Sequence, residues 1–334
     1  MSEATTKEKR VSDVEGISRL NSSFVNLRNE ISKVIIGQEE IVRQIFVTIL
    51  SRGHCLLIGV PGLAKTLLVR TFADALDLKY SRIQFTPDLM PSDITGTEII
   101  EENVTTGERA FKFVKGPLFG NIILADEINR TPPKTQSALL EAMQENHVTA
   151  AGQVFRLEPP FFVLATQNPI EQEGTYPLPE AQLDRFMFNL WLDYPSFEEE
   201  VKIVQTTTGD YVPSIRKAVV GSDILYFQYL VRRVPVSESV VKYAVDLANR
   251  TRPQNAGAPD FVKQFVSYGA GPRASQYLIL GAKATAALEN RLSPDIDDVK
   301  SAAVPVLRHR IITNFNAEAE NINTPEIIRR LLEK

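Results

Sequence analysis

Residue types that carry particular chemistry are scarce in this sequence of 334 residues, which has one cysteine, one tryptophan and three histidines. The single cysteine, Cys55, excludes an internal disulfide and is compatible with a reducing compartment. His54, His147 and His309 are scattered, and none stands at metal-ligand spacing from another histidine or cysteine, so a zinc site is not predicted. No pairing of serine or cysteine with histidine indicates a nucleophilic triad.

Long apolar runs and a strong excess of one charge are also missing. No run approaches the roughly 20 consecutive residues that a membrane-spanning helix needs, and residues 1–10 lack the apolar core of a signal peptide. The net charge of −4 gives no general attraction to nucleic acid or anionic lipid. We therefore expect a cytoplasmic protein without membrane insertion, in which residues 1–22 form a flexible N-terminal tail.

The most specific pattern is a phosphate-binding loop between an apolar run at residues 55–58 and a helical pattern at residues 67–73. Such a loop turns backbone N–H groups and the positive end of the helix toward an anion. Lys65 would reach the outer phosphates, and the Thr66 hydroxyl would be a ligand of Mg²⁺. Ala64 replaces the second glycine of the general G-x-x-x-x-G-K-[ST] pattern, so we expect this residue to stay right-handed. The predicted nucleotide-binding residues of this segment are Gly59, Val60, Pro61, Gly62, Leu63, Ala64, Lys65, Thr66 and Leu67.

Two adjacent carboxylates follow a second apolar run, at residues 121–125. A buried strand of a parallel sheet would bring them to the same sheet edge as the phosphate loop. Asp126 would hold Mg²⁺ through its water, and Glu127 would orient and polarise the water that attacks the γ-phosphate. An apolar run before Asp-Glu is often only a strand that leads into a solvated turn. Its position after a phosphate loop favours the catalytic interpretation.

Two more polar residues stand at the ends of a predicted strand and a predicted short helix. Asn168 follows the apolar run at residues 161–167, where it could hold the attacking water or contact the γ-phosphate, although Asn-Pro also starts turns. Arg185 ends a short helical pattern at residues 179–186. It is either a surface charge paired with Asp184 or an arginine finger that projects toward a neighbouring subunit.

The alternation of strand and helix patterns stops near residue 195. Residues 23–195 therefore indicate an α/β domain, with a parallel sheet flanked by helices, and residues 196–334 indicate a smaller helical domain. Arg273 stands at the start of a long helical pattern, facing back toward the first domain. It is either a surface charge or a residue that reports ATP occupancy.

Together these motifs resemble the AAA+ ATPases, and specifically the MoxR family. The resemblance rests on residues 59–66, 85–96, 126–130, 165–169 and 174–186, and it spans roughly residues 35–312. It implies a P-loop AAA+ domain with hairpin insertions, followed by a helical lid domain. It also implies a ring-shaped homo-hexamer that binds ATP and Mg²⁺ between subunits and remodels or matures a protein client, frequently with a partner that carries a von Willebrand factor A domain.

The same resemblance implies roles for single residues. The segment Ile36-Gly37-Gln38 would lie against the adenine, Asn168 would be sensor 1, Arg185 the arginine finger and Arg273 sensor 2. Whether Arg273 serves the ATP of its own subunit or that of its neighbour stays open.

The charges of two predicted hairpins bear on whether the client is a protein or a nucleic acid. The first spans residues 97–114 and carries more carboxylates than cations, and the second spans residues 147–157 with no lysine or arginine at its tip. A hairpin that grips phosphates needs positive charge. The charges therefore favour a protein client, although both hairpins could be oligomer contacts. The charged residues of the first hairpin are Glu98, Glu101, Glu102, Glu108, Arg109 and Lys112.

The sequence thus predicts an ATPase that couples hydrolysis to reshaping a protein. Other possibilities are the motor subunit of a metal chelatase, a nucleic-acid translocase, and a nucleotide-gated scaffold with little turnover. Glu127 and Arg185 argue against the scaffold, because they serve hydrolysis rather than binding alone.

Overall fold

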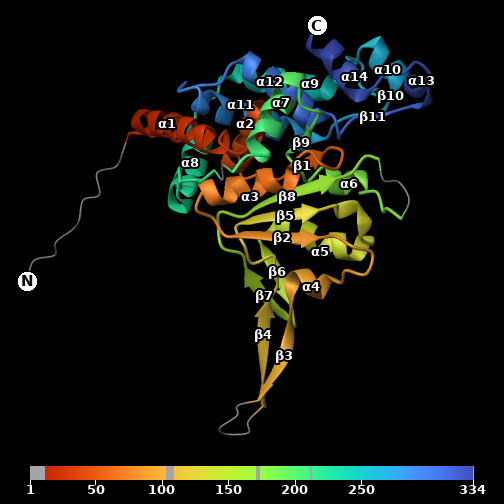
Figure 1. Cartoon of the computed structure of the whole chain (residues 1–334). Coiled ribbons are helices and arrows are strands. Elements are labelled where there is room, and N and C mark those ends of the chain that lie inside the picture. The colour runs from red at the N-terminus through yellow and green to blue at the C-terminus, as the bar shows by residue number, and fades with distance from the viewer. Residues whose placement is uncertain (1–11, 103–108, 171–173, 211–212, 334) are drawn as a thin grey trace, which may run out of the picture.

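Five strands form a central sheet in which every neighbouring pair is parallel (Figure 1). The computed structural model describes residues 12–102, 109–170, 174–210 and 213–333. Because the strands run the same way, the residues that follow β1, β5 and β8 meet at one edge of the sheet, the edge formed by the carboxyl ends of the strands. In spatial order the strands are β2 (Tyr80–Gln84), β5 (Ile122–Asp126), β8 (Phe162–Gln167), β1 (Cys55–Ile58) and β9 (Phe188–Trp191).

Both faces of the sheet are buried. In β5, Ile122 and Leu124 belong to one apolar cluster, whereas Ile123 and Ala125 belong to another, because successive side chains of a strand point to opposite faces. The first cluster also holds side chains of α1 (Asp13–Ile31), α2 (Glu39–Leu50), α3 (Lys65–Ala75) and the second domain. The second cluster holds side chains of α4 (Pro91–Thr95), η1 (Ile128–Arg130) and α5 (Pro133–Glu145). Strands covered on both faces read as continuous apolar runs, which is why they were visible in the sequence.

Two antiparallel hairpins extend the first domain, as predicted. β3 (Gly96–Glu102) pairs with β4 (Arg109–Lys115), and β6 (His147–Ala150) pairs with β7 (Gln153–Arg156). Figure 1 shows β3 and β4 projecting from the body of the molecule. Phe113 of β4 stacks on Phe155 of β7 with ring centroids 4.2 Å apart, so the two hairpins contact each other. The predicted turn of the first hairpin, residues 105–107, lies outside the described residues.

The second domain is mostly helical, and α11 (Pro272–Leu288) lies at its centre. α11 packs against three helices of its own domain and also against α1 and α2. Two short strands, β10 (Val266–Tyr268) and β11 (Ile312–Thr313), pair with each other and were not predicted. The remaining helices are α6 (Glu180–Leu183) in the first domain and α7 (Phe197–Thr207), α8 (Gly221–Arg233), α9 (Glu238–Arg250), α10 (Asp260–Phe265), α12 (Ile296–Leu307), α13 (Phe315–Ala319) and α14 (Thr324–Leu332) in the second.

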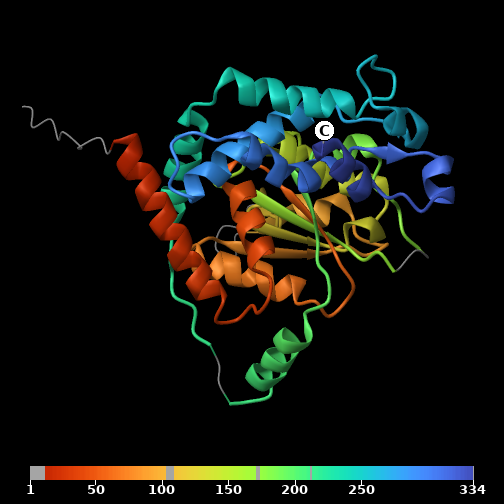
Figure 2. The same cartoon turned by 90° about the horizontal axis from the view of Figure 1, so that it is seen from above.

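α7 connects the two domains and projects from the body of the molecule, with Glu199 of its first turn against Gly37 of the first domain (Figure 2). Ser196 caps it, and Glu199 completes a capping box. None of its residues is buried. The helix therefore depends on its cap and its acidic first turn more than on packing.

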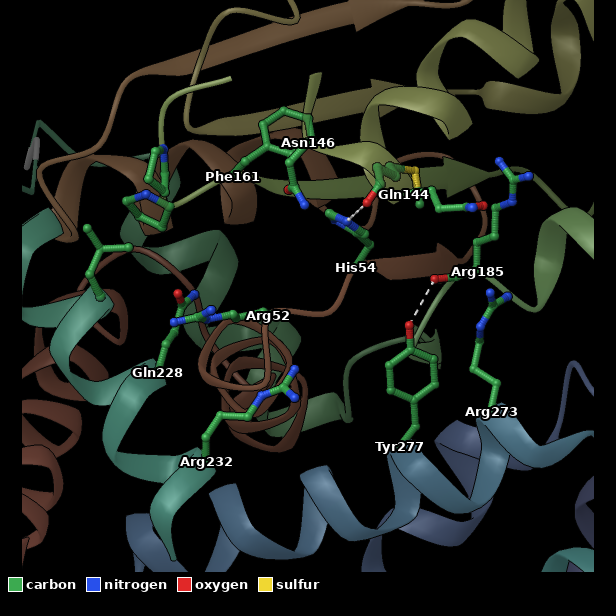
Figure 3. A pocket seen from close by; sticks show the side chains of 14 residues that line it. Arg52, His54, Gln144, Asn146, Phe161, Arg185, Gln228, Arg232, Arg273 and Tyr277 are labelled. Carbon is green, nitrogen blue, oxygen red and sulfur yellow. Dashed lines mark hydrogen bonds between the residues drawn. The ribbon is translucent and has the colours of Figure 1, made fainter. Parts of the chain in front are cut away.

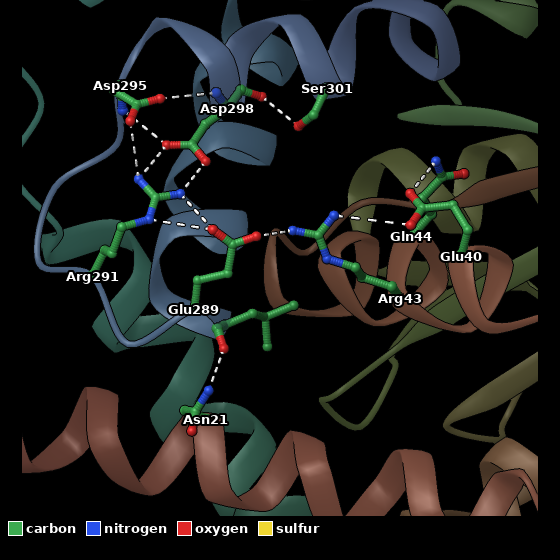
Figure 4. Close-up of polar contacts among 10 residues, drawn as sticks. Asn21, Glu40, Arg43, Gln44, Glu289, Arg291, Asp295, Asp298 and Ser301 are labelled. Carbon is green, nitrogen blue, oxygen red and sulfur yellow. Dashed lines mark hydrogen bonds and ion pairs between the residues drawn. The ribbon is translucent and has the colours of Figure 1, made fainter.

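A chain of ion pairs attaches the helical domain to α2 (Figure 4). Arg43 of α2 pairs with Glu289, whose other oxygen accepts from Arg291 at 2.8 Å. Arg291 also donates to Asp298 at 2.8 Å, and the Asp298 side chain is only 4% exposed. These contacts, with the apolar packing of α11, position the second domain against the first.

The predicted extent of the N-terminal tail is wrong for residues 13–22. They form the first half of α1, which begins with a capping box at Ser12 and Glu15. Ile17 and Leu20 are buried, so apolar packing orders a segment that we expected to be solvated. The rest of the predicted tail, residues 1–11, lies outside the described residues. Within the described ranges, no helix combines the length and the apolar character that a membrane crossing requires.

Candidate nucleotide site

The predicted phosphate loop, residues 59–67, connects β1 to the first turn of α3. Gly62 has φ +87°, and Ala64, which precedes the helix, has φ +55° and ψ +24°. The prediction that Ala64 stays right-handed is therefore wrong. A left-handed alanine costs roughly 1–2 kcal/mol. It is held in place because Leu63 is buried and Lys65 donates to the carbonyl oxygens of Gly59 and Val60, the latter at 3.1 Å.

The predicted base-contacting segment, Ile36 to Gln38, lies beside this loop. The Gln38 side chain donates through Nε2 to the Leu63 carbonyl at 3.3 Å. Its Oε1 atom is buried and has no hydrogen-bond partner. Gly37 has φ +76°, and the Glu199 carboxylate lies where a β-carbon on Gly37 would have to go. The structure thus brings the two predicted nucleotide-binding segments together.

Asp126 ends β5 and lies at the point where β1, β5 and β8 converge. Its Oδ1 accepts from the Thr166 hydroxyl at 2.6 Å, and its Oδ2 accepts from the Thr66 hydroxyl at 3.5 Å. Thr66 and Asp126 therefore offer two hard oxygen ligands on facing segments. This donor set fits Mg²⁺, which is commonly held by one or two protein oxygens and keeps several waters. Among the described residues, no group of three or more histidine, cysteine or acidic side chains is arranged to hold a metal ion.

Glu127 follows directly and adopts a left-handed conformation with φ +57°. Its backbone N–H donates to the Thr166 hydroxyl at 2.9 Å, which fixes the turn. The carboxylate oxygen Oε2 accepts from Gln84 at 3.0 Å and from Arg130 at 3.2 Å. The side chain is about a quarter exposed, so it can reach a solvent molecule at this edge.

Asn168 follows β8 at the same edge and is only 5% exposed. Its Oδ1 accepts from the Ile170 N–H at 3.1 Å, whereas its Nδ2 is buried and has no partner among the described residues. A buried amide N–H₂ without a partner is costly unless a ligand or water completes it. Asn168 is therefore oriented by its own turn and keeps a donor for another group.

Arg185 and Arg273 lie elsewhere. They line a cavity of about 620 Å³ together with Arg52, His54 and Tyr277 (Figure 3). His54 precedes β1, whereas the phosphate loop follows β1. The cavity therefore lies at the edge formed by the amino ends of the strands, and the loop lies at the edge formed by their carboxyl ends. Within the cavity wall, Arg185 donates to the Leu140 carbonyl at 2.9 Å, and Arg273 pairs with Asp184 at 2.9 Å.

Three residues of the site were not predicted from the sequence. Thr166 contacts both Asp126 and Glu127, Gln84 contacts Glu127, and Arg82 donates to Asp126 through Nε at 3.1 Å and through Nη2 at 2.7 Å. Arg82 and Gln84 are two residues apart in β2, so their side chains lie on the same face of the strand. That spacing was the available signal, but it becomes informative only when β2 is known to pair with β5.

Comparisons with known proteins agree with this geometry. The profile of the ATPase family associated with various cellular activities (AAA) matches residues 54–188, and that of the AAA lid domain matches residues 260–331. The chaperone MoxR1 of Mycobacterium tuberculosis is 45% identical over 305 residues, which cover 91% of this chain and 79% of that protein. The uncharacterised protein YeaC of Bacillus subtilis is 42% identical over 303 residues, covering 90% of this chain and 91% of that one. A crystal structure from Cytophaga hutchinsonii, of a protein assigned as an ATPase, superimposes with a TM-score of 0.88 at 44% identity and covers 96% of each chain.

The parallel sheet followed by a helical domain, together with the matches to the AAA and AAA lid profiles, defines the class as AAA+. Within that class, the chain belongs to the MoxR family of ATPases.

Proposed function

We propose that this protein hydrolyses ATP to ADP and phosphate at the edge where β1, β5 and β8 end. The observation that carries the proposal is the convergence of Thr66, Asp126, Glu127 and Thr166 through contacts of 3.5 Å or less. These residues come from three separate segments, and Thr66, Asp126 and Glu127 are of the types that hold Mg²⁺ and position water in phosphoryl transfer.

The loop and its neighbours bind the nucleotide. Lys65 and the loop N–H groups meet the phosphates, and the segment from Ile36 to Gln38 lies against the adenine. Thr66 and Asp126 hold Mg²⁺, which neutralises charge on the phosphates when it is bound. The buried Oε1 of Gln38, which has no partner in the protein, supports a hydrogen-bond acceptor role near the base.

Glu127 and Asn168 act on the water and the γ-phosphate. The Glu127 carboxylate orients the attacking water and polarises it. The Nδ2 donor of Asn168, buried without a partner, serves the γ-phosphate or the water. This assignment gives the buried amide the hydrogen bond that the described protein atoms do not supply.

Arg185 and Arg273 serve the nucleotide of the neighbouring subunit. They line one cavity at the sheet edge opposite the phosphate loop, so a head-to-tail contact brings them to the loop edge of the next copy. A repeated head-to-tail contact closes into a ring, which we propose to be a homo-hexamer. This placement supports action of Arg273 in trans, at the nucleotide of the neighbouring subunit.

The β3–β4 hairpin is the proposed contact for a protein client. Ile100 and Phe111 stand opposite each other in the hairpin and are 63% and 75% exposed. Two cations of this hairpin, Arg109 and Lys112, pair with Glu102 and Glu101, and a third, Lys115, lies over the Phe119 ring with Nζ 5.1 Å from its centroid. Apolar side chains beside neutralised cations suit a polypeptide better than a phosphate backbone. A protein with a von Willebrand factor A domain is a partner of the kind that the family implies.

Nucleotide binding is tested with Lys65→Ala, which removes the cation that meets the outer phosphates. Calorimetry with ATP and Mg²⁺ should show loss of tight binding. Lys242→Ala, in α9, is the control because its side chain is 75% exposed and pairs only with Glu238 in the same helix. ATP affinity in Lys65→Ala equal to that of the control would refute the phosphate-loop assignment.

Hydrolysis is tested with Glu127→Gln, which keeps the size of the side chain and loses its charge. ATP should still bind, while turnover should fall by about 10²–10⁴-fold, the usual cost of removing a placed catalytic group. Phosphate release and calorimetry measure the two effects separately. Near-normal turnover would place the catalytic carboxylate elsewhere.

The type of client is tested by fluorescence anisotropy with single- and double-stranded DNA at moderate salt. We expect no useful affinity, because Arg109 and Lys112 of the β3–β4 hairpin are already paired with carboxylates. Sub-micromolar binding that weakens steeply with added salt would contradict the assignment of a protein client.

A further inference from the structure

Arg82 holds the carboxylate of Asp126 with a guanidinium from the neighbouring strand. Both hydrogen bonds from Arg82, at 3.1 Å from Nε and at 2.7 Å from Nη2, end on the same oxygen, Oδ2. Nη2 also donates to Oε1 of Gln84 at 2.5 Å. Three contacts thus fix the direction of this guanidinium, which distinguishes it from a loosely placed surface ion pair.

Oδ2 is also the oxygen that faces the phosphate loop. It lies 3.5 Å from the Thr66 hydroxyl, whereas Oδ1 is engaged by the Thr166 hydroxyl at 2.6 Å. A divalent cation held between Thr66 and Asp126 therefore has to use the oxygen that Arg82 occupies. The positive guanidinium and the metal would repel each other at such short range.

We propose that Arg82 is a positioning residue that competes with Mg²⁺ for Oδ2 of Asp126. With no metal bound, the guanidinium keeps this nearly buried carboxylate paired and correctly directed. When Mg²⁺ arrives with the nucleotide, Arg82 leaves Oδ2. The Arg82 side chain is 47% exposed whereas that of Asp126 is 10% exposed, so the arginine can turn into solvent and the carboxylate stays in place.

Competition and simple support predict opposite changes in metal affinity when the charge of Arg82 is removed. If Arg82 competes, removing its charge makes the metal bind more tightly. If Arg82 only holds Asp126 in place, removing it makes the metal bind more weakly. The proposal rests on the nucleotide site proposed above, and the experiment has to separate failure of the site from failure of the competition.

The experiment measures Mn²⁺ binding in the presence of ADP, from the electron paramagnetic resonance signal of the free ion. ADP avoids turnover, so the readout does not depend on activity. Arg82→Gln should bind Mn²⁺ about two- to five-fold more tightly than the unaltered protein, the range expected for loss of a competing, partly exposed ion pair. Arg82→Lys keeps the charge but loses the forked donors, and its affinity should lie between the two.

Arg329→Gln, in α14, is the matched control, because that arginine also pairs with a carboxylate, Glu326, but lies outside the site. Its Mn²⁺ affinity should equal that of the unaltered protein. Equal or weaker Mn²⁺ binding in Arg82→Gln, or a reversed order for Arg82→Lys, overturns the competition while the nucleotide site stands. Absence of ADP-dependent Mn²⁺ binding in the unaltered protein refutes the nucleotide site itself.

Discussion

Folding places His54 in surroundings that accept only its neutral form. Its Nδ1 accepts from the Val163 N–H at 3.0 Å, and its Nε2 lies 3.1 Å from the Met143 carbonyl oxygen. A proton on Nδ1 would point at the Val163 N–H, which is itself a donor, so this hydrogen bond exists only while Nδ1 is unprotonated. Burial lowers the pKa of His54 from its ordinary value to about 4, and burial, assisted by Arg310, lowers the pKa of His309 well below its ordinary value.

We expect stability to fall as the pH drops from about 6.5 toward 4. In this window His54 and His309 take up a proton in the unfolded chain but not in the folded protein, so protonation favours unfolding. A folded pKa near 4 for His54 makes the loss on the order of 3 kcal/mol across the whole window. His54→Gln can make the same two hydrogen bonds without titrating, so its melting temperature should fall less between pH 7.5 and 5.5. Equal pH dependence in both proteins would contradict the assignment to His54.

At this scale, the sequence was sufficient to predict the placement of residues that stand at a recognisable spacing from an apolar run. Lys65, Thr66, Asp126 and Glu127 each follow an apolar run in a recognisable spacing, and the structure brings the last three together. Arg82 was not predictable, because its contact with Asp126 depends on the pairing of β2 with β5. Local steric reasoning also failed for Ala64, since its neighbours in the loop hold it in a conformation that alanine alone disfavours.

At the scale of elements, Arg310 joins the helical domain to the segment that leads into β9. Its side chain is 2% exposed, and it pairs with Asp184 at 2.7 Å. It also donates to the carbonyl oxygens of Asp184 at 2.8 Å, Phe186 at 2.7 Å and Met187 at 3.3 Å. One guanidinium therefore satisfies the backbone of the segment that leads from Arg185 into the sheet.

Arg310→Leu should lower the free energy of unfolding by about 3 kcal/mol, because it leaves buried carbonyl groups and a carboxylate without their donors. Urea unfolding followed by circular dichroism measures the change. Arg329→Leu removes an arginine that is 58% exposed and should change stability by about 0.5 kcal/mol or less. Similar losses in the two variants would mean that Arg310 does not anchor the domain.

The sequence predicted long elements better than short or peripheral ones. β1, β5 and β8 of the central sheet stand out as continuous apolar runs and α11 as a long helical pattern, and all four were expected. β10 and β11 contain three and two residues, too few to show a period. The first turns of α1 were assigned to a tail, because Ile17 and Leu20 are separated by polar residues and become buried only when α8 and α11 pack against the helix.

At the scale of the whole molecule, the two halves of the proposed active site lie at opposite edges of one sheet. The loop edge carries Lys65 and Glu127, and the other edge carries the cavity with Arg185 and Arg273. A single chain therefore has a nucleotide pocket and, separately, the arginines that the pocket of another copy needs. This division predicts that two differently inactivated chains can complement each other.

Arg185→Ala should bind ATP almost normally and hydrolyse it very slowly. Arginine fingers supplied in trans are worth about 10³–10⁵-fold in rate, because they stabilise charge on the transferring group. Lys65→Ala should be inactive for the opposite reason, since its arginine is intact and its pocket is not. Mixing the two variants pairs the intact pocket of one chain with the intact arginine of the other. Some activity should return, and it should peak at an intermediate mixing ratio.

The measurement is the ATPase rate against the mixing ratio, with subunit exchange confirmed by a labelled chain. Lys242→Ala mixed with Lys65→Ala is the control, because it shows how far defective pockets slow a ring whose arginines are all intact. Complete exchange with no recovery at any ratio, together with loss of ATP binding in Arg185→Ala alone, would mean that Arg185 acts on its own subunit. That result would also remove the reason to place Arg273 at the neighbour's nucleotide, because the two arginines share one cavity.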